Sequence, residues 1–184
     1  TKTGAGVLAL SAVNTFTGPT TVSAGGLLVN GTTAAASAFT VSSGAFLGGI
    51  GRVGGDVTVN GGIAPGSNGI GSLNAASSST NNDLLNVAGA FNSGSGSSFT
   101  FDFANSGSDG WYKLVDYTTT NFATGTNTSF TANNVPSGKT ANFVVDSASS
   151  ALYVQIVPEP STIALAVFGA VTCVWACRRR RRPA

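Results

Sequence analysis

The five-residue stretch TVSAG at residues 21–25 recurs as TVSSG at residues 40–44 and as TVNGG at residues 58–62. The copies start 19 and 18 residues apart. A segment of that length cannot bury its own apolar face, so each copy must stack on its neighbours. Each copy also places a β-branched pair shortly before a glycine, as expected for a strand that ends in a turn. The repeat therefore predicts strands coiled into a β-solenoid, with Val22, Val41 and Val59 in one interior row.

The residues around each copy alternate in the way expected of strands with one buried face. The side chains predicted to fill the interior are Val22, Leu27, Val29, Val57, Val59 and Ile63. Gly25, Gly26 and Gly31 are assigned to corners where a positive φ is needed, and Pro65 is expected to end a strand. In such a coil each strand pairs with the rungs on either side of it, so few charged side chains are needed.

The composition fits a surface covered by hydroxyl and amide groups rather than by charge. Only 9% of the 184 residues are charged and 42% are hydrophobic, whereas an ordinary soluble domain carries roughly 25% charged residues. The chain has no His and no Met, and its one Glu is Glu159. Imidazole catalysis, histidine metal sites and paired glutamates are therefore excluded, and we expect no metal and no cofactor. Strand-rich extracellular material is favoured over a cytoplasmic enzyme.

The charges are unevenly distributed along the chain. Residues 1–157 hold four basic residues against six aspartates, a net charge of −2. The other basic residues are Arg178, Arg179, Arg180, Arg181 and Arg182. These arginines follow an apolar run instead of lying on a folded basic face with interleaved aromatic residues, so we expect no nucleic-acid partner.

Beyond about residue 75 the repeat is less regular. A Ser/Asn-rich loop at residues 75–82 precedes DLLNVAGAF at residues 83–91, which is predicted to be one further strand. Later strands are expected at residues 99–103, 111–117, 141–146 and 151–157, the last two joined by the hairpin turn SASS. We interpret this part as a cap that closes the solenoid with Phe99, Phe101, Phe103, Trp111, Tyr112 and Tyr117. The predicted organisation is solenoid repeats at 1–74, a strand-rich cap at 75–157 and a separate tail at 158–184.

The first rung carries a recognisable pattern. It combines a Thr-Lys-x-Gly-x-Gly opening, an Asn-Thr-Phe-Thr-Gly turn and a Thr-Thr-Val strand. The residues that form it are Lys2, Gly4, Gly6, Asn14, Thr15, Phe16, Thr17, Gly18, Thr20, Thr21 and Val22. Residues 1–31 thereby resemble the autotransporter-associated β-strand repeat. The resemblance implies a right-handed parallel β-helix like that of passenger regions on cell-surface proteins.

Two glycine-rich motifs are better explained by the fold than by a ligand. Residues 49–54, GIGRVG, fit the dinucleotide-binding pattern, but a strand follows and Asn74 stands where the acidic residue would be needed. We expect these glycines at corners between rungs. Asp56 follows a Gly-rich run reminiscent of calcium-binding repeats, yet the run occurs once. Asp56 is therefore expected to be a solvated turn residue.

Many β-helices cleave polysaccharides with clustered acids, and the remaining aspartates are the candidates for such a catalytic set. They are Asp83, Asp102, Asp109, Asp116 and Asp146. Their positions do not recur at the rung spacing, so no two can be placed at a catalytic carboxylate separation. We expect exposed strand and turn carboxylates and no catalytic residue.

The tail consists of three parts. Pro158, Glu159 and Pro160 precede a run without charge at residues 161–177, and the five arginines follow that run. As a helix the run would span roughly 25 Å, a little short of a ~30 Å hydrocarbon core. The arginines would keep its end on the cytoplasmic side. Cys173 and Cys177 lie four residues apart on one face of this helix, either facing lipid or as sites of reversible acylation.

This arrangement strongly resembles the PEP-CTERM sorting signal, with Pro158, Glu159, Pro160, Ser161 and Thr162 as the motif. The resemblance implies processing by an exosortase, a membrane-embedded cysteine transpeptidase that removes the helix. We expect Pro158 to Pro160 to be an extended stretch outside the strands, where cleavage takes place. A plain single-span anchor is the alternative.

Together these observations predict a non-enzymatic protein of the cell surface or extracellular matrix, with a precursor held in the inner membrane. Its expected partners are an exosortase, the membrane during processing, and an extracellular polysaccharide as a further candidate. The alternative function is a polysaccharide-active β-helix enzyme whose catalytic rungs lie upstream of these residues.

Overall fold

The computed structural model describes residues 1–66, 84–94, 99–103 and 109–159, with the side chains of Thr100 and Asp102 left out. Every regular element in these ranges is a β-strand, and no helix occurs among them. A search of the same residues found no helix long and apolar enough to cross a membrane. The predicted transmembrane helix at residues 161–177 lies outside the described residues.

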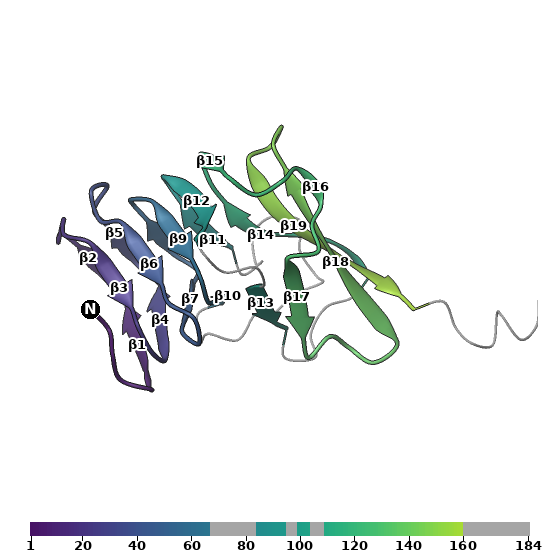
Figure 1. The fold of residues 1–184 in the computed structure, drawn as a ribbon, viewed down its shortest axis with the longest axis horizontal. Coiled ribbons are helices and arrows are strands. Elements are labelled where there is room, and N and C mark those ends of the chain that lie inside the picture. Colours follow the sequence, from purple (N-terminus) through teal and green to yellow (C-terminus); the bar gives the residue numbers. More distant parts are fainter. Residues whose placement is uncertain (67–83, 95–98, 104–108, 160–184) are drawn as a thin grey trace, which may run out of the picture.

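The strands form rungs of three that stack along the long axis of the molecule (Figure 1). The first rung comprises β1 (Val7–Leu10), β2 (Val13–Asn14) and β3 (Thr20–Val22). The second comprises β4 (Gly26–Val29), β5 (Thr32–Thr33) and β6 (Phe39–Val41). The third comprises β7 (Phe46–Gly49), β8 (Arg52–Val53) and β9 (Val57–Val59). The fourth comprises β10 (Gly62–Pro65), β11 (Leu85–Val87) and β12 (Ala90–Ser93).

Neighbouring rungs pair in parallel on all three faces, so the all-β solenoid is confirmed. The right-handed sense of the coil stays a prediction.

The predicted interior row is confirmed. Val22 pairs with Val41 and Val41 with Val59 across β3, β6 and β9, and all three side chains are fully buried. The other predicted interior residues, Leu27, Val29, Val57 and Ile63, are at most 2% exposed. Pro65 is the last residue of β10, as expected. A period of 18 or 19 residues thus returns a valine to the same place in each of these rungs.

The three glycines assigned to corners need glycine for different reasons, which corrects the sequence expectation. Gly25 has a φ of +65° and forms a true corner. Gly26 lies inside β4, where a Cβ would collide with the ring of Phe46. Gly31 does not have a positive φ, but a Cβ there would collide with the backbone of Ala12 in the rung beside it. Glycine is therefore required for two reasons in these rungs: a positive φ at a corner, and the lack of space for a Cβ where neighbouring rungs approach closely.

Gly25 and Gly44 allow the effect of a positive φ to be separated from the effect of close packing, because both are left-handed corners at equivalent places in the repeat. Their φ angles are +65° and +78°. A Cβ on Gly44 would meet no atom within 4 Å, whereas one on Gly25 would collide with the carbonyl oxygens of Gly4 to Gly6. We expect Gly44→Ala to lower the free energy of unfolding by about 1 kcal/mol through backbone strain alone. Gly25→Ala should cost clearly more in chemical denaturation, and equal losses would contradict the close-packing explanation.

The parallel stack continues after residues 67–83, which lie outside the described residues and include the predicted boundary at residue 74. β11 pairs with β8 and β12 with β9. DLLNVAGAF was predicted as one strand, but the chain turns at Ala88 and Gly89, so β11 and β12 lie on two different faces. The prediction was wrong because a corner needs only two small residues. Ala88 and Gly89 do not interrupt the apolar pattern enough to be recognised as a corner.

A mixed sheet forms beyond the fourth rung. β13 (Phe99–Asp102) lies beside β10, and β14 (Gly110–Asp116) and β15 (Thr119–Thr120) extend the two other faces. The remaining strands are β16 (Gly125–Thr126), β17 (Phe130–Asn133), β18 (Lys139–Asp146) and β19 (Ala151–Pro158). The hairpin of β18 and β19 is confirmed, and β19 pairs antiparallel with β14. The antiparallel strands close the end of the stack that lies farthest from the N-terminus (Figure 1).

An aromatic cluster fills the space between the stack and this hairpin. It consists of Phe91, Phe99, Phe101, Phe103, Tyr117, Phe122, Phe130 and Phe143. Burial, together with the charges of Asp146 and Asp116, raises the pKa of Tyr117, whose hydroxyl donates to the carbonyl of Ala151 at 3.2 Å. Five of the six aromatic residues predicted to fill the cap are indeed buried. The exception is Trp111, which is 57% exposed.

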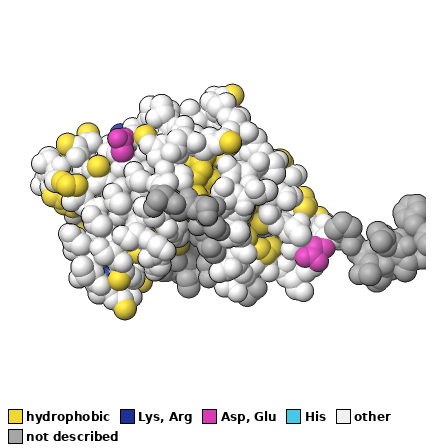
Figure 2. Space-filling model, viewed as in Figure 1, with side chains coloured by type: hydrophobic (Ala, Val, Ile, Leu, Met, Phe, Trp, Pro, Cys, Tyr) yellow, Lys and Arg dark blue, Asp and Glu magenta, His cyan; other side chains and the backbone are white. Residues whose placement is uncertain are grey.

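Among the described residues, the strands of the first rung pair with the second rung on one side, and on the other side only Lys2 pairs with them. Leu8 of β1 lies in register with Leu27 of β4 and Leu47 of β7. Leu27 and Leu47 are at most 2% exposed, whereas Leu8 is 47% exposed. Lys2 forms a parallel bridge to Val22 on its open side, and its ammonium donates to the carbonyl of Ala24 at 2.9 Å. Figure 2 shows apolar side chains gathered at this end of the molecule and few charges on the visible face.

Candidate functional site

The structure describes the first two residues of the predicted sorting motif. Pro158 is the last residue of β19 and pairs with Lys139 of β18. Both Pro158 and Glu159 are exposed, and the amide of Glu159 donates to the carbonyl of Gly138 at 2.8 Å. The motif therefore does not start outside the strands, which corrects the expectation. Pro160, Ser161 and Thr162, the cysteines of the apolar run, and the arginine cluster lie outside the described residues.

The geometry on the two edges of β19 differs near Pro158. The pairing with β14 ends at Ile156, which lies opposite Gly110. The pairing with β18 continues through Val157 and Pro158. Within the described part of the chain, Val157 and Pro158 thus pair with β18 alone, and Glu159 bonds to Gly138 just before β18. No described strand pairs with the other edge of these three residues. An extended backbone with a free edge is the form in which peptides add to a sheet of another protein.

The dinucleotide-like motif at residues 49–54 is confirmed as a set of corner glycines. Gly49 ends β7 with a φ of +113°, and the strand β8 follows. A Cβ on Gly49, Gly51 or Gly54 would collide with backbone atoms of the second rung. These glycines therefore allow the third rung to lie against the second.

Asp56 is exposed, as expected for a turn residue, and it has a structural partner. Its Oδ1 accepts a hydrogen bond from the amide of Ala90 at 2.8 Å and so ties the third rung to the fourth. The described residues contain no group of three or more His, Cys, Asp or Glu side chains placed to bind a metal ion.

Each of the three other aspartates whose side chains are described also has a partner within the fold. Asp109 lies 3.1 Å from Lys139 Nζ, and Asp116 lies 3.2 Å from Lys113 Nζ. Asp146 accepts from the Ser149 hydroxyl at 2.6 Å and from the Ala148 amide at 2.9 Å. Asp83 and the side chain of Asp102 lie outside the described residues.

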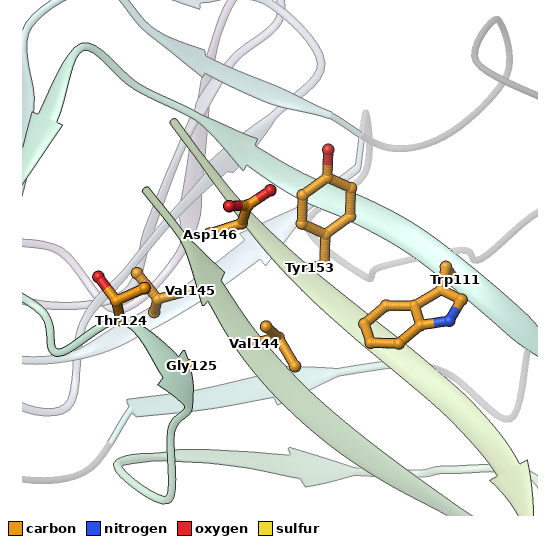
Figure 3. Close-up of a pocket in the computed structure, with 7 residues that line it drawn as sticks. All are labelled: Trp111, Thr124, Gly125, Val144, Val145, Asp146 and Tyr153. Carbon is orange, nitrogen blue, oxygen red and sulfur yellow. The ribbon is translucent and has the colours of Figure 1, made fainter. Parts of the chain in front are cut away.

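The outward face of the antiparallel strands carries a groove that sequence reasoning missed. It has a volume of about 460 Å³. The residues that line it are Trp111 on β14, Tyr153 on β19, Val144, Val145 and Asp146 on β18, and Thr124 and Gly125 next to them. Figure 3 shows both aromatic rings standing on the sheet, with the Asp146 carboxylate directed toward the side of Tyr153.

The ring of Tyr153 is held from two sides. Lys113 Nζ lies 5.9 Å from the ring centroid, as in a cation–π contact. At the other end, Tyr153 Oη lies 3.2 Å from Ser149 Oγ, which donates its hydrogen to Asp146. The hydrogen bond from Ser149 and then that from the Ala148 amide hold the pKa of Asp146 below its usual range. The groove thus has a fixed aromatic wall and an ionised acceptor beside it.

Trp111 was assigned to the cap interior because it lies in an aromatic segment. The alternation within β14 contains the signal that would have corrected this. Tyr112 and Leu114 are buried, whereas Trp111 and Lys113 share the opposite, outward face. Residues two apart on a strand lie on the same face, so a tryptophan two residues from an outward-facing lysine is expected to be exposed.

Comparison with protein families gives one finding. Residues 1–29 match the model of the passenger-associated-transport-repeat. The matched residues cover the first rung and β4, and this repeat indicates a secreted or cell-surface protein. Neither the curated proteins nor the solved structures gave a match.

Proposed function

We propose that the protein is a non-enzymatic component of the cell surface or extracellular matrix that is sorted through a PEP-CTERM signal at its C-terminus. The observation that carries the surface assignment is the match of the first rung to the passenger-associated-transport-repeat. A stack covered mainly by hydroxyl and amide groups supports it, since such a body exposes little charge to interact unspecifically.

In this proposal an exosortase reads Pro158, Glu159 and Pro160 while residues 161–177 hold the precursor in the inner membrane. Arg178 to Arg182 would remain cytoplasmic, because basic residues set orientation and each contributes about 1 kcal/mol against anionic lipid. Cleavage would then release the body or attach it at the surface. Among the described residues no strand pairs with the second edge of β19 near Pro158, and this supports access, because an enzyme can pair with an extended strand along such an edge.

Replacing Pro158, Glu159 and Pro160 together with alanine tests the proposal in cells that contain an exosortase. The variant should still fold and insert, because Pro158 donates no backbone hydrogen bond and neither the apolar run nor the arginines change. We expect an uncleaved membrane-bound form to accumulate, seen as a larger species in the membrane fraction. The matched control is alanine at Ser147, Ser149 and Ser150 in the turn before β19, which should leave processing intact.

Mass spectrometry of the surface or released fraction gives the decisive measurement. Mature wild-type protein should lack residues 161–182. Peptides spanning residues 157–177 in that fraction would mean that the tail is an ordinary anchor, and the exosortase assignment would be wrong.

A further inference from the structure

We propose that the groove between Trp111, Tyr153 and Asp146 binds a neutral polysaccharide chain. The inference gives the proposed surface function a ligand, and it rests on that function for the setting in which a glycan is met. Its geometric basis is independent of how the tail is processed.

The first argument is the presentation of the aromatic rings. Trp111 is 57% exposed although its strand is paired along its length with β19, so a large apolar ring stands in water on a rigid base. Tyr153 stands beside it on the neighbouring strand and is held by Lys113 and Ser149. Rigid aromatic side chains offer contact area at a low entropic cost. The C–H faces of pyranose rings are flat apolar surfaces of matching size.

The second argument is the charge of the lining. Asp146 is the one charged residue among those that line the groove. Lys113 lies beside the ring of Tyr153, but its ammonium is paired with Asp116 at 3.2 Å, so the charge left over at the groove is negative. The Asp146 carboxylate accepts hydrogen bonds, and the hydroxyl of Thr124 both donates and accepts. Sugar hydroxyl groups satisfy such partners, whereas a phosphate, a nucleotide or an acidic glycan would be repelled by the carboxylate. The ligand is therefore neutral.

The third argument is the shape of the site. The floor is the face of a paired sheet, since β14, β19 and β18 are hydrogen-bonded to one another there. An extended peptide that binds by strand addition needs a free edge rather than a face. A groove of about 460 Å³ lies in the range of small-molecule sites, and the aromatic residues line its side as Figure 3 shows. A chain of sugar rings laid across the face fits this arrangement.

The proposal is tested by calorimetric titration of the full chain in detergent with three neutral hexasaccharides: cellohexaose, maltohexaose and mannohexaose. Hexagalacturonate is the charged control. We expect at least one neutral chain to bind about tenfold more tightly than hexagalacturonate, and Trp111→Ala to weaken that binding by about tenfold or more. Trp111→Phe should retain part of the affinity, because a smaller ring still stacks.

Phe16→Ala is the matched control, since Phe16 is an exposed aromatic residue in the first rung, outside the groove, and its loss should leave binding unchanged. The proposal is overturned if none of the neutral chains binds at 10 mM, if hexagalacturonate binds as well as they do, or if Trp111→Ala binds like the wild type. Thermal unfolding of each variant shows whether it is folded. Processing of the tail is scored separately in cells, so failure of glycan binding and failure of the sorting proposal are distinguishable.

Discussion

Replacing Val41 with Asp is expected to abolish cooperative folding. Val41 is fully buried and lies between Val22 and Val59 in the interior row. A carboxylate at this place has no partner in the row, and burying an unpaired charge belongs to the few changes that cost more than about 4 kcal/mol. A loss of that size is a large part of the roughly 5–15 kcal/mol that a domain of ordinary stability has. Circular dichroism during chemical denaturation measures it.

The control for this change is Thr40→Asp on the same strand. Thr40 precedes Val41 in β6, is exposed, and lies opposite the uncharged Thr21 and Thr58 on the neighbouring strands. A carboxylate there meets water and no like charge, so stability should change by no more than about 0.5 kcal/mol. If both variants unfolded at the same denaturant concentration, the assignment of inward and outward faces would be wrong.

Replacing Phe130 with Ala is expected to lower the free energy of unfolding by about 3–5 kcal/mol. Phe130 is 5% exposed. Its ring centroid lies between 4.8 and 5.8 Å from those of four other phenylalanines. They are Phe99, Phe101, Phe122 and Phe143. Removing the ring would leave a cavity between the stack and the hairpin, where rigid strands on both sides limit relaxation.

Phe16→Ala provides the comparison for this prediction as well. Phe16 is 39% exposed and has one described aromatic neighbour, Phe39, at 6.5 Å. Its loss should cost about 1 kcal/mol, because part of the ring is already in water. Denaturation curves of the two variants should therefore separate clearly. Equal midpoints would show that the aromatic cluster does not stabilise the junction.

The solenoid could be predicted from sequence because its constraints repeat at short range. Each rung needs an interior β-branched residue and then a glycine, so Val22, Val41 and Val59 reveal both the period and the buried face. What the pattern did not distinguish is why a glycine is needed. The collision of a Cβ on Gly26 with Phe46 depends on a side chain 20 residues away in the next rung, and no local pattern contains that contact.

The groove could not be predicted for the same physical reason. Trp111 and Tyr153 line one groove only because β14 and β19 pair in one particular antiparallel register, with an irregularity between Lys113 and Val115. No turn joins these two strands, because β15 to β18 lie between them in the sequence, so no local pattern contains that register. Likewise, Pro158 was expected outside the strands because Pro158 to Pro160 lie between the last predicted strand and the apolar run. A proline at the end of a strand loses no hydrogen bond that the ladder needs, so β19 includes it.

The position of β19 in its sheet determines how the fold would respond to mechanical load. β19 lies between β14 and β18 and leads directly into the C-terminal segment. A pull on the chain beyond Glu159 acts along the strand axis and strains the hydrogen bonds to both neighbours together, in shear. A strand at a sheet edge would instead peel away one bond at a time. The strand that leads into the tail is therefore one with hydrogen-bonded neighbours on both sides, which resists extraction better than an edge strand does.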